Sequence, residues 1–97
     1  MIKSFADKAT AALFSGRRLR SLPSDIHRRA YAKLQALDAA DTLDFLRVPP
    51  SKRLEPLRGH REGHWSIRIN DQWRICFRWE DRYAYDVEVT DYQSSRE

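Results

Sequence analysis

The feature that most constrains the fold is an alternation of apolar and polar side chains between positions 65 and 79. One set of alternate positions carries Trp65, Ile67, Ile69, Trp73, Ile75, Phe77 and Trp79. The positions between them carry Ser66, Arg68, Arg74, Cys76 and Arg78. Successive side chains of a β-strand point to opposite faces, and the stretch 70–72 (Asn, Asp, Gln) is a turn signal, so the sequence predicts an antiparallel hairpin. One face of the hairpin is apolar, and the other is a platform of arginines.

Helices are predicted before this hairpin. Residues 8–14 follow Asp7, which suits an N-cap, and Gly16 is placed to end the helix. A stronger helix opens at residues 23–25 (Pro, Ser, Asp), where Pro suits the first turn and Ser and Asp suit the cap and the positive end of the helix dipole. Its apolar residues recur on one face: Ile26, Ala30, Leu34 and Leu37. This face is expected to pack on the apolar side of the hairpin, with residues 27–29 and 33 pointing outward.

The remaining segments complete an α+β fold. A short helix is expected at residues 41–46, an edge strand at 2–5, and a last strand at 85–90 with an acidic polar face. A further strand is expected to begin at residues 53–55, and Pro56 either ends it or places it at an edge of the sheet. The predicted architecture has the N-terminal helices packed on one face of a small antiparallel β-sheet, with the other face open for a ligand. Residues 1–93 are expected to form a single domain, and residues 94–97 a short flexible tail.

Length and composition narrow the class of protein. A chain of 97 residues buries only about 60 to 65% of the surface that its unfolded form exposes, so most large apolar residues are structural. No apolar run approaches the length of a membrane span and the N-terminus has no apolar signal core, so we expect a cytoplasmic protein without a membrane partner. The single cysteine, Cys76, cannot form an internal disulfide, and the ligands of a structural zinc are lacking, so we expect no metal and no cofactor.

Positive charge is unevenly distributed along the chain. Residues 1–33 carry eight Lys or Arg against two acids, and residues 47–78 carry eight against three. Fourteen of the eighteen cations are arginine, whose planar fork suits phosphate oxygens and base stacking. Nucleic acid is therefore the leading class of partner, with a solvated basic surface as the alternative. For Arg17, Arg18 and Arg20 in particular, a solvated loop is the prediction, with contact to an RNA backbone as the alternative.

Several motifs together resemble the HigB toxins, a branch of the RelE and ParE toxin superfamily. They are residues 54–59 (LEPLRG), 61–63 (REG), 65–68 (WSIR), 73–77 (WRICF) and the closing pair Asp91 and Tyr92, and the first five residues are similar too. The match covers essentially residues 1–93. The resemblance implies a RelE-like fold and a type II toxin that cleaves mRNA on the translating ribosome without a metal. It also implies a HigA-type helix-turn-helix antitoxin as partner, with operator DNA contacted only through that antitoxin.

The resemblance assigns candidate catalytic residues. The basic residue before the turn glycine falls on Arg58, the strand arginine on Arg74, and the terminal pair on Asp91 and Tyr92. Two positions depart from the family pattern: family members often carry His where this chain has Gln93, and some carry His where it has Glu55. Both departures fall among groups expected to move protons.

Metal-free RNA cleavage requires a base for the 2′-hydroxyl, cations for the charge on the phosphorane and an acid for the leaving 5′-oxygen. Arg58 and Arg74 suit the charge role, although a salt bridge from Arg74 to Asp86 or Glu88 is an equal alternative from the residues alone. Asp91 or Glu55 suits the base, and Tyr92 suits stacking or hydrogen-bond donation. The acid stays unassigned, with His60 a candidate. The residues expected to contact RNA are Arg61, Arg68, Arg78 and His60.

Two other functions stay open. With the His positions altered, the protein could be a weakly active or inactive toxin homologue that acts mainly as an antitoxin-binding co-repressor. A gyrase poison, as in ParE relatives, is a third hypothesis.

Overall fold

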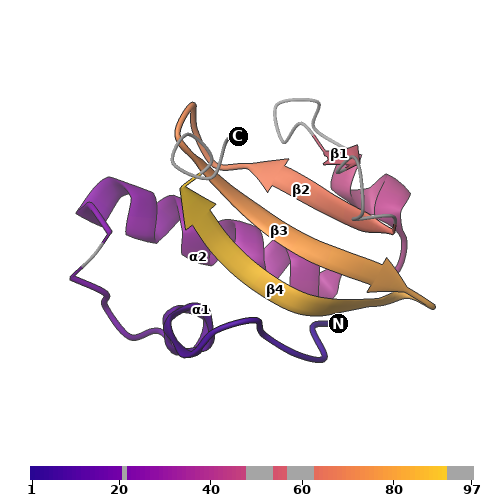
Figure 1. Ribbon diagram of the computed structural model, residues 1–97, viewed down its shortest axis with the longest axis horizontal. Helices are drawn as coiled ribbons and strands as arrows, with labels where there is room; N and C mark the ends of the chain where they lie inside the picture. Colours follow the sequence, from indigo (N-terminus) through magenta and orange to yellow (C-terminus); the bar gives the residue numbers. More distant parts are fainter. Residues whose placement is uncertain (21, 48–53, 57–62, 92–97) are drawn as a thin grey trace.

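A computed structural model describes residues 1–20, 22–47, 54–56 and 63–91 of the chain. The elements in order are α1 (Lys8–Phe14), α2 (Ser24–Ala39), the 3-10 helix η1 (Leu43–Arg47), β1 (Glu55–Pro56), β2 (His64–Arg68), β3 (Trp73–Glu80) and β4 (Tyr83–Asp91). The strands form one antiparallel sheet in the order β1-β2-β3-β4. Figure 1 shows α2 crossing one face of this sheet and α1 beside the β4 edge. The predicted α+β class is confirmed, whereas the bounds of the domain and of the tail stay predictions.

The core lies between α2 and the sheet. The apolar stripe of α2 is buried as predicted, at Ile26, Ala30, Leu34 and Leu37. It joins a cluster that includes Leu13 of α1 and the inward residues of the strands, Ile67, Ile75, Phe77, Ala84 and Val87. Because each α-helical turn returns the same face to the sheet, four apolar residues at this spacing suffice to fix α2 on it.

The helix ends are only partly as expected. Asp7 caps α1, since its Oδ1 accepts a 2.7 Å hydrogen bond from the amide of Thr10. Gly16 follows this helix with φ +95°, a left-handed conformation that glycine adopts without strain. The cap predicted for α2 is wrong, because Pro23 occupies the N-cap position and no side chain caps the helix there. Ser24 is instead the first helical residue, and Asp25 lies in the first turn, where its charge complements the helix dipole.

The N-terminal segment lies along β4 but is not the regular edge strand that was predicted. It makes two isolated parallel bridges, from Ile2 to Ala84 and from Phe5 to Val87. Between these bridges Asp86 has φ +55° and adds a bulge to β4 opposite β3. The bulge interrupts the ladder, and the Ser4 hydroxyl accepts a hydrogen bond from the Asp86 amide at 2.9 Å.

The hairpin has the two faces that were predicted. Trp65 lies opposite Phe77, and Ile67 opposite Ile75, on the face covered by α2. Ser66 lies opposite Cys76, and Arg68 opposite Arg74, on the other face. The division into an apolar and a polar face is therefore confirmed.

The expectation that the polar face is open is wrong at its centre. The exposed fraction is 1% for Ser66, 5% for Cys76 and 7% for Arg74. One physical reason is an ion pair from β1 to β3, described below, that spans the intervening strand β2 beside Ser66. The accessible part of this face is thus its rim rather than its middle.

A hydrogen bond from β4 to Thr10 connects α1 to the sheet, and a substitution of Thr10 tests its contribution. The buried hydroxyl oxygen of Thr10 accepts a 3.0 Å hydrogen bond from the amide of Val89 on β4. Thr10→Val keeps the side-chain shape but leaves that amide without its acceptor, so we expect the free energy of unfolding to fall by about 1 to 3 kcal/mol. Urea denaturation measures this change. Thr90→Val is the control, expected within about 0.5 kcal/mol of the parent, since no hydrogen bond joins its hydroxyl to a described residue. An unaltered midpoint for Thr10→Val would contradict the assignment.

Candidate functional site

Arg74 is the central cation of the polar face. It lies on β3 between Arg68 of β2 and Thr90 of β4 in the pairing register. It is the only charged residue among the described ones that is classed as buried. A buried guanidinium with a fixed direction is a preorganised donor for an anion.

Glu55 holds Arg74 in place. Its Oε1 atom lies 2.5 Å from Nη2 of Arg74, while the side chain of Glu55 stays 55% exposed. Glu55 belongs to the edge strand β1, where it pairs with Ser66 of β2, so the ion pair reaches across the whole of β2. The carboxylate therefore lies on the same face as the arginine and is accessible to solvent. Arg74 therefore has Glu55 as a partner, which was not one of the two acids considered from the sequence, and Asp86 lies beside Arg78.

The two other predicted arginines of the platform are also paired. Arg68 forms an ion pair with Asp71 in the β2–β3 turn. Arg78 contacts Glu80 at 2.5 Å and Asp86 at 3.6 Å, and its guanidinium lies 4.5 Å above the centre of the Tyr85 ring. The platform is therefore largely neutralised by neighbouring carboxylates, which the sequence alternation alone did not reveal.

Asp91 does not share the face of Arg74. It pairs with Trp73 across β3 and β4, whereas Arg74 pairs with Thr90. Since neighbouring residues of a strand point to opposite faces, Asp91 is directed to the side of the sheet that carries α2. There its Oδ2 accepts a 2.9 Å hydrogen bond from the side chain of Gln72. The structure thus brings Glu55, and not Asp91, to the buried arginine.

Several candidate residues lie outside the described part of the chain. They are Arg58, His60, Arg61 and Tyr92. Their predicted roles stay predictions. Within the described residues, no group of three or more His, Cys, Asp or Glu side chains is arranged to hold a metal ion. None of the described helices is long and apolar enough to cross a membrane.

Sequence comparison places the chain in a family. Residues 3–92 match the model for the RelE-like toxin of type II toxin-antitoxin system HigB. The chain belongs to the HigB toxin family. As a member of a toxin–antitoxin family, it has an antitoxin as its partner.

Two HigB relatives are similar over nearly their whole length. Toxin HigB-1 of Vibrio cholerae is 40% identical over 88 residues, which cover 90% of this chain and 93% of the relative. Endoribonuclease HigB of Proteus vulgaris is 38% identical over 92 residues, which cover 95% and 99%. The resemblance stated from the motifs is therefore confirmed.

Solved structures of a more distant protein, YafQ, share the fold. YafQ from E. coli strain BL21(DE3) aligns with a TM-score of 0.59 at 10% identity, covering 97% of each chain. A substitution mutant of YafQ from E. coli aligns with a TM-score of 0.61 at 11% identity and the same coverage. At this identity the likeness concerns the fold alone.

We expect the ion pair between Glu55 and Arg74 to contribute to the free energy of unfolding. Glu55→Ala removes the carboxylate from a buried guanidinium, so we expect this HigB chain to lose about 1 to 2 kcal/mol of unfolding free energy. Glu80→Ala is the matched control, because it removes a carboxylate from the half-buried Arg78, which keeps Asp86, and it should lose less than about 0.5 kcal/mol. Chemical denaturation of both variants gives the comparison. Equal losses would show that the Glu55 pair behaves as an ordinary surface pair.

Proposed function

We propose that this HigB chain is a ribosome-dependent mRNA endonuclease that inhibits translation by cleaving RNA without a metal. The observation that carries the proposal is the buried Arg74, oriented by Glu55 on the polar face of the sheet. The name of the Proteus vulgaris relative, an endoribonuclease, supports the same activity here. The proposed site of action is the cytoplasm, with mRNA on the ribosome as substrate.

The chemistry proposed is attack of the ribose 2′-oxygen on the adjacent phosphorus. The 2′-hydroxyl gives its proton to a base, the bond to the 5′-oxygen breaks, and that oxygen gains a proton. Charge builds up on the non-bridging phosphate oxygens in between, where a fixed guanidinium acts most strongly. Arg74 supplies this charge in the proposal, together with Arg58.

Glu55 is the proposed general base. Two carboxylates were candidates, and the pairing register of the strands directs Asp91 to the opposite side of the sheet from Arg74. The carboxylate of the partly exposed Glu55 side chain contacts the same guanidinium that would bind the phosphate, so a bound phosphate and the carboxylate would lie within reach of one another. Asp91 stays in the proposal as the alternative base, and Tyr92 as a group for base stacking or hydrogen-bond donation.

The proposed partners follow from the family. The antitoxin is proposed to be of the HigA type, with a helix-turn-helix domain that binds operator DNA, so that the toxin reaches the operator only through it. The alternative function is a toxin homologue of weak activity that serves mainly as co-repressor, supported by Gln93 and Glu55 in place of His.

Arg58 and Arg74 give the first test of activity. We expect brief induction of the chain to arrest growth and to produce new mRNA 5′ ends within codons. Arg58→Ala and Arg74→Ala should each lower the cleavage rate at least about 100-fold, because removal of one preorganised donor raises such barriers by about 3 kcal/mol. Gln93→His should leave the arrest intact or strengthen it. RNA-end mapping after induction measures each variant.

Arg82→Ala is the control for these variants, because Arg82 is exposed in the β3–β4 turn and should be dispensable. Harmless expression of the parent chain, with intact elongation and co-purification of a DNA-binding partner, would favour the co-repressor function. DNA damage signalling without mRNA cleavage would indicate gyrase poisoning.

A second test separates the two carboxylates. Glu55→Gln keeps the hydrogen bond to Arg74 but removes the proton acceptor, so cleavage of ribosome-bound mRNA should fall by about 10² to 10⁴. Asp91→Asn should change the rate by less than about tenfold. Single-turnover cleavage on purified ribosomes measures both. If Asp91→Asn loses activity and Glu55→Gln keeps it, Glu55 only orients the arginine and the base must be sought at the end of β4.

A further inference from the structure

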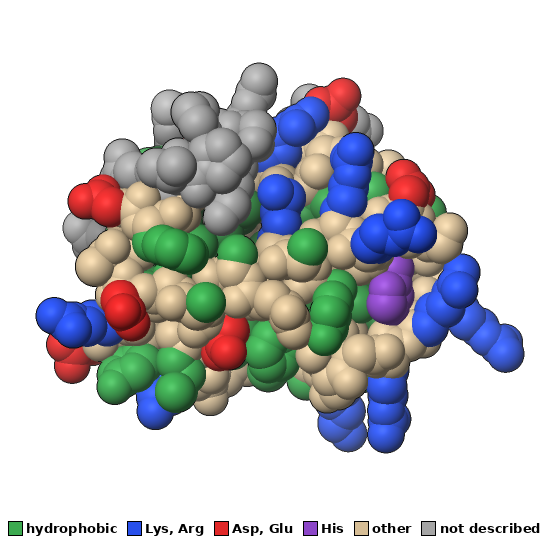
Figure 2. All heavy atoms as spheres, turned by 180° about the vertical axis from the view of Figure 1, so that it is seen from behind, with side chains coloured by type: hydrophobic (Ala, Val, Ile, Leu, Met, Phe, Trp, Pro, Cys, Tyr) green, Lys and Arg blue, Asp and Glu red, His purple; other side chains and the backbone are tan. Residues whose placement is uncertain are grey.

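Among the described residues, the largest concentration of exposed cations lies on the helical face, away from the arginine platform. Between residues 17 and 33 the chain carries six Lys or Arg against the single acid Asp25. Figure 2 shows Lys and Arg side chains gathered over the half of this face where α2 begins. Five of these residues are exposed arginines: Arg17, Arg18, Arg20, Arg28 and Arg29.

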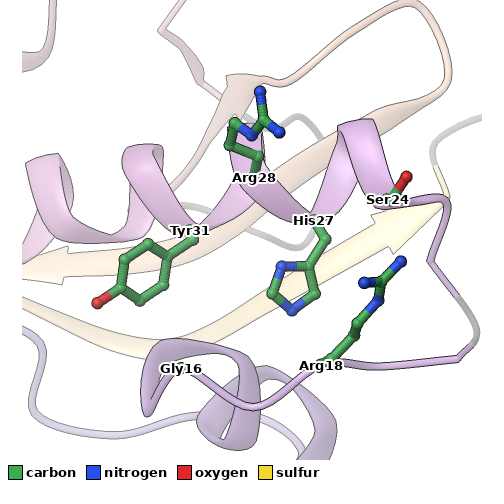
Figure 3. Close-up of a pocket in the computed structure, with 6 residues that line it drawn as sticks. All are labelled: Gly16, Arg18, Ser24, His27, Arg28 and Tyr31. Carbon is green, nitrogen blue, oxygen red and sulfur yellow. The ribbon is translucent and has the colours of Figure 1, made fainter.

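Two of these arginines, Arg18 and Arg28, line a cleft. A cavity of about 570 Å³ opens between the segment after α1 and the first turns of α2. Its lining residues are Gly16, Arg18, Ser24, His27, Arg28 and Tyr31. Figure 3 shows the side chain of Arg18 rising toward Ser24, and the ring of Tyr31 lying one turn beyond His27. Cations from both walls and an aromatic ring therefore border the same hollow.

The walls of the cleft are fixed relative to one another. The imidazole Nε2 of His27 lies 2.8 Å from the carbonyl oxygen of Arg17, which joins α2 to the segment after α1. The segment also turns sharply at Gly16, whose amide donates to the carbonyl of Leu13 at 3.0 Å. A preformed cleft binds a ligand with less loss of conformational freedom than a loop that must order first.

The charges of the cleft differ from those of the polar sheet face. There Arg68, Arg74 and Arg78 each have a carboxylate partner. In contrast, no ion pair joins any of the five helical-face arginines to a described carboxylate, although Asp25 lies only one turn before Arg28 and Arg29. Exposed like charges without partners repel one another, and a polyanion would relieve that repulsion.

We propose that this cleft binds the sugar-phosphate backbone of folded RNA, as a second RNA surface on the side of the molecule opposite the cleavage site. Arginine forks fit phosphate oxygens, and the ring of Tyr31 offers a face on which a base or ribose can stack. Because α2 covers the opposite face of the sheet from Arg74, both surfaces can be occupied at once. The choice of ribosomal RNA as the source of this backbone rests on the proposed function. The cleft then anchors the protein while the polar face cleaves.

The test uses Arg18→Glu combined with Arg28→Glu, which places carboxylates on both walls of the cleft. The control combines Lys8→Glu with Arg82→Glu, two exposed cations that do not line it, so the change in net charge is the same. Binding is measured to purified 70S ribosomes without mRNA and to a labelled RNA hairpin, over a range of salt concentrations. Circular dichroism and co-purification with the antitoxin report folding, and Arg18→Gln with Arg28→Gln provides a neutral pair if the acidic pair is unstable.

We expect the cleft variant to bind ribosomes and hairpin at least about tenfold more weakly, and its log–log salt dependence to be shallower by roughly 2, one unit per lost phosphate contact. The control should bind within about threefold of the parent. Equal losses in both variants would overturn the proposal in favour of net charge alone. Unchanged RNA binding with weakened antitoxin binding would also overturn it and assign the cleft to the partner protein.

The two proposals fail separately. Binding is measured on ribosomes without mRNA, so it does not depend on cleavage. If the parent chain binds RNA through the cleft but never cleaves mRNA, only the proposed function is contradicted. If the parent chain cleaves mRNA and the cleft variant binds and cleaves equally well, only the proposed role of the cleft is contradicted.

Discussion

The pairing register of β2, β3 and β4 is the constraint on which the rest of the structure depends. A shift by one residue would move every side chain of a strand to the other face of the sheet. With the observed register, Ile67, Ile75 and Phe77 meet the buried stripe of α2. Because that burial supplies the main stabilisation of so small a domain, the register is fixed by the core. The placement of Arg74 on the polar face is then a consequence of the same hydrophobic packing.

Because Arg74 is buried, its positive charge needs an anionic partner, and Glu55 is that partner. Burying a guanidinium is unfavourable unless hydrogen-bonded anions compensate it, and Glu55 is an anion at 2.5 Å. A phosphate that binds the same group would meet an arginine whose direction is already set. A neutral imidazole at residue 55 would compensate the buried cation less than this carboxylate does. Glu55 is therefore an electrostatic partner of Arg74 in its own right.

Much of the fold was predictable because it follows from local periodicity. The stripe of α2, the Asp7 cap, the hairpin and its two faces all follow from residues close in sequence. Apart from the N-cap of α2, the errors arose where distant segments meet. The bulge at Asp86 interrupts the N-terminal bridges, and the reach of Glu55 across β2 closes the centre of the polar face. Neither could be seen in the alternation of one strand, because both depend on which segment becomes its neighbour. The same holds for Asp91, whose face depends on its pairing with Trp73.

The surroundings of the charged residues depend on which face of the folded protein they occupy, and not on their position along the sequence. Counting along the sequence gave two basic blocks of equal size. In the sheet, the described arginines Arg68, Arg74 and Arg78 each contact a carboxylate from a turn or from β1 or β4, so their charges act mainly over short distances. The block around the start of α2 has few acids near it, so its field extends outward into solvent. Long-range attraction to a polyanion would therefore act on the helical face, and short-range chemistry on the sheet face. An enzyme that must find a large anionic assembly and then act on one phosphate benefits from that separation, because the surface that attracts the assembly does not compete with the site for the reacting phosphate.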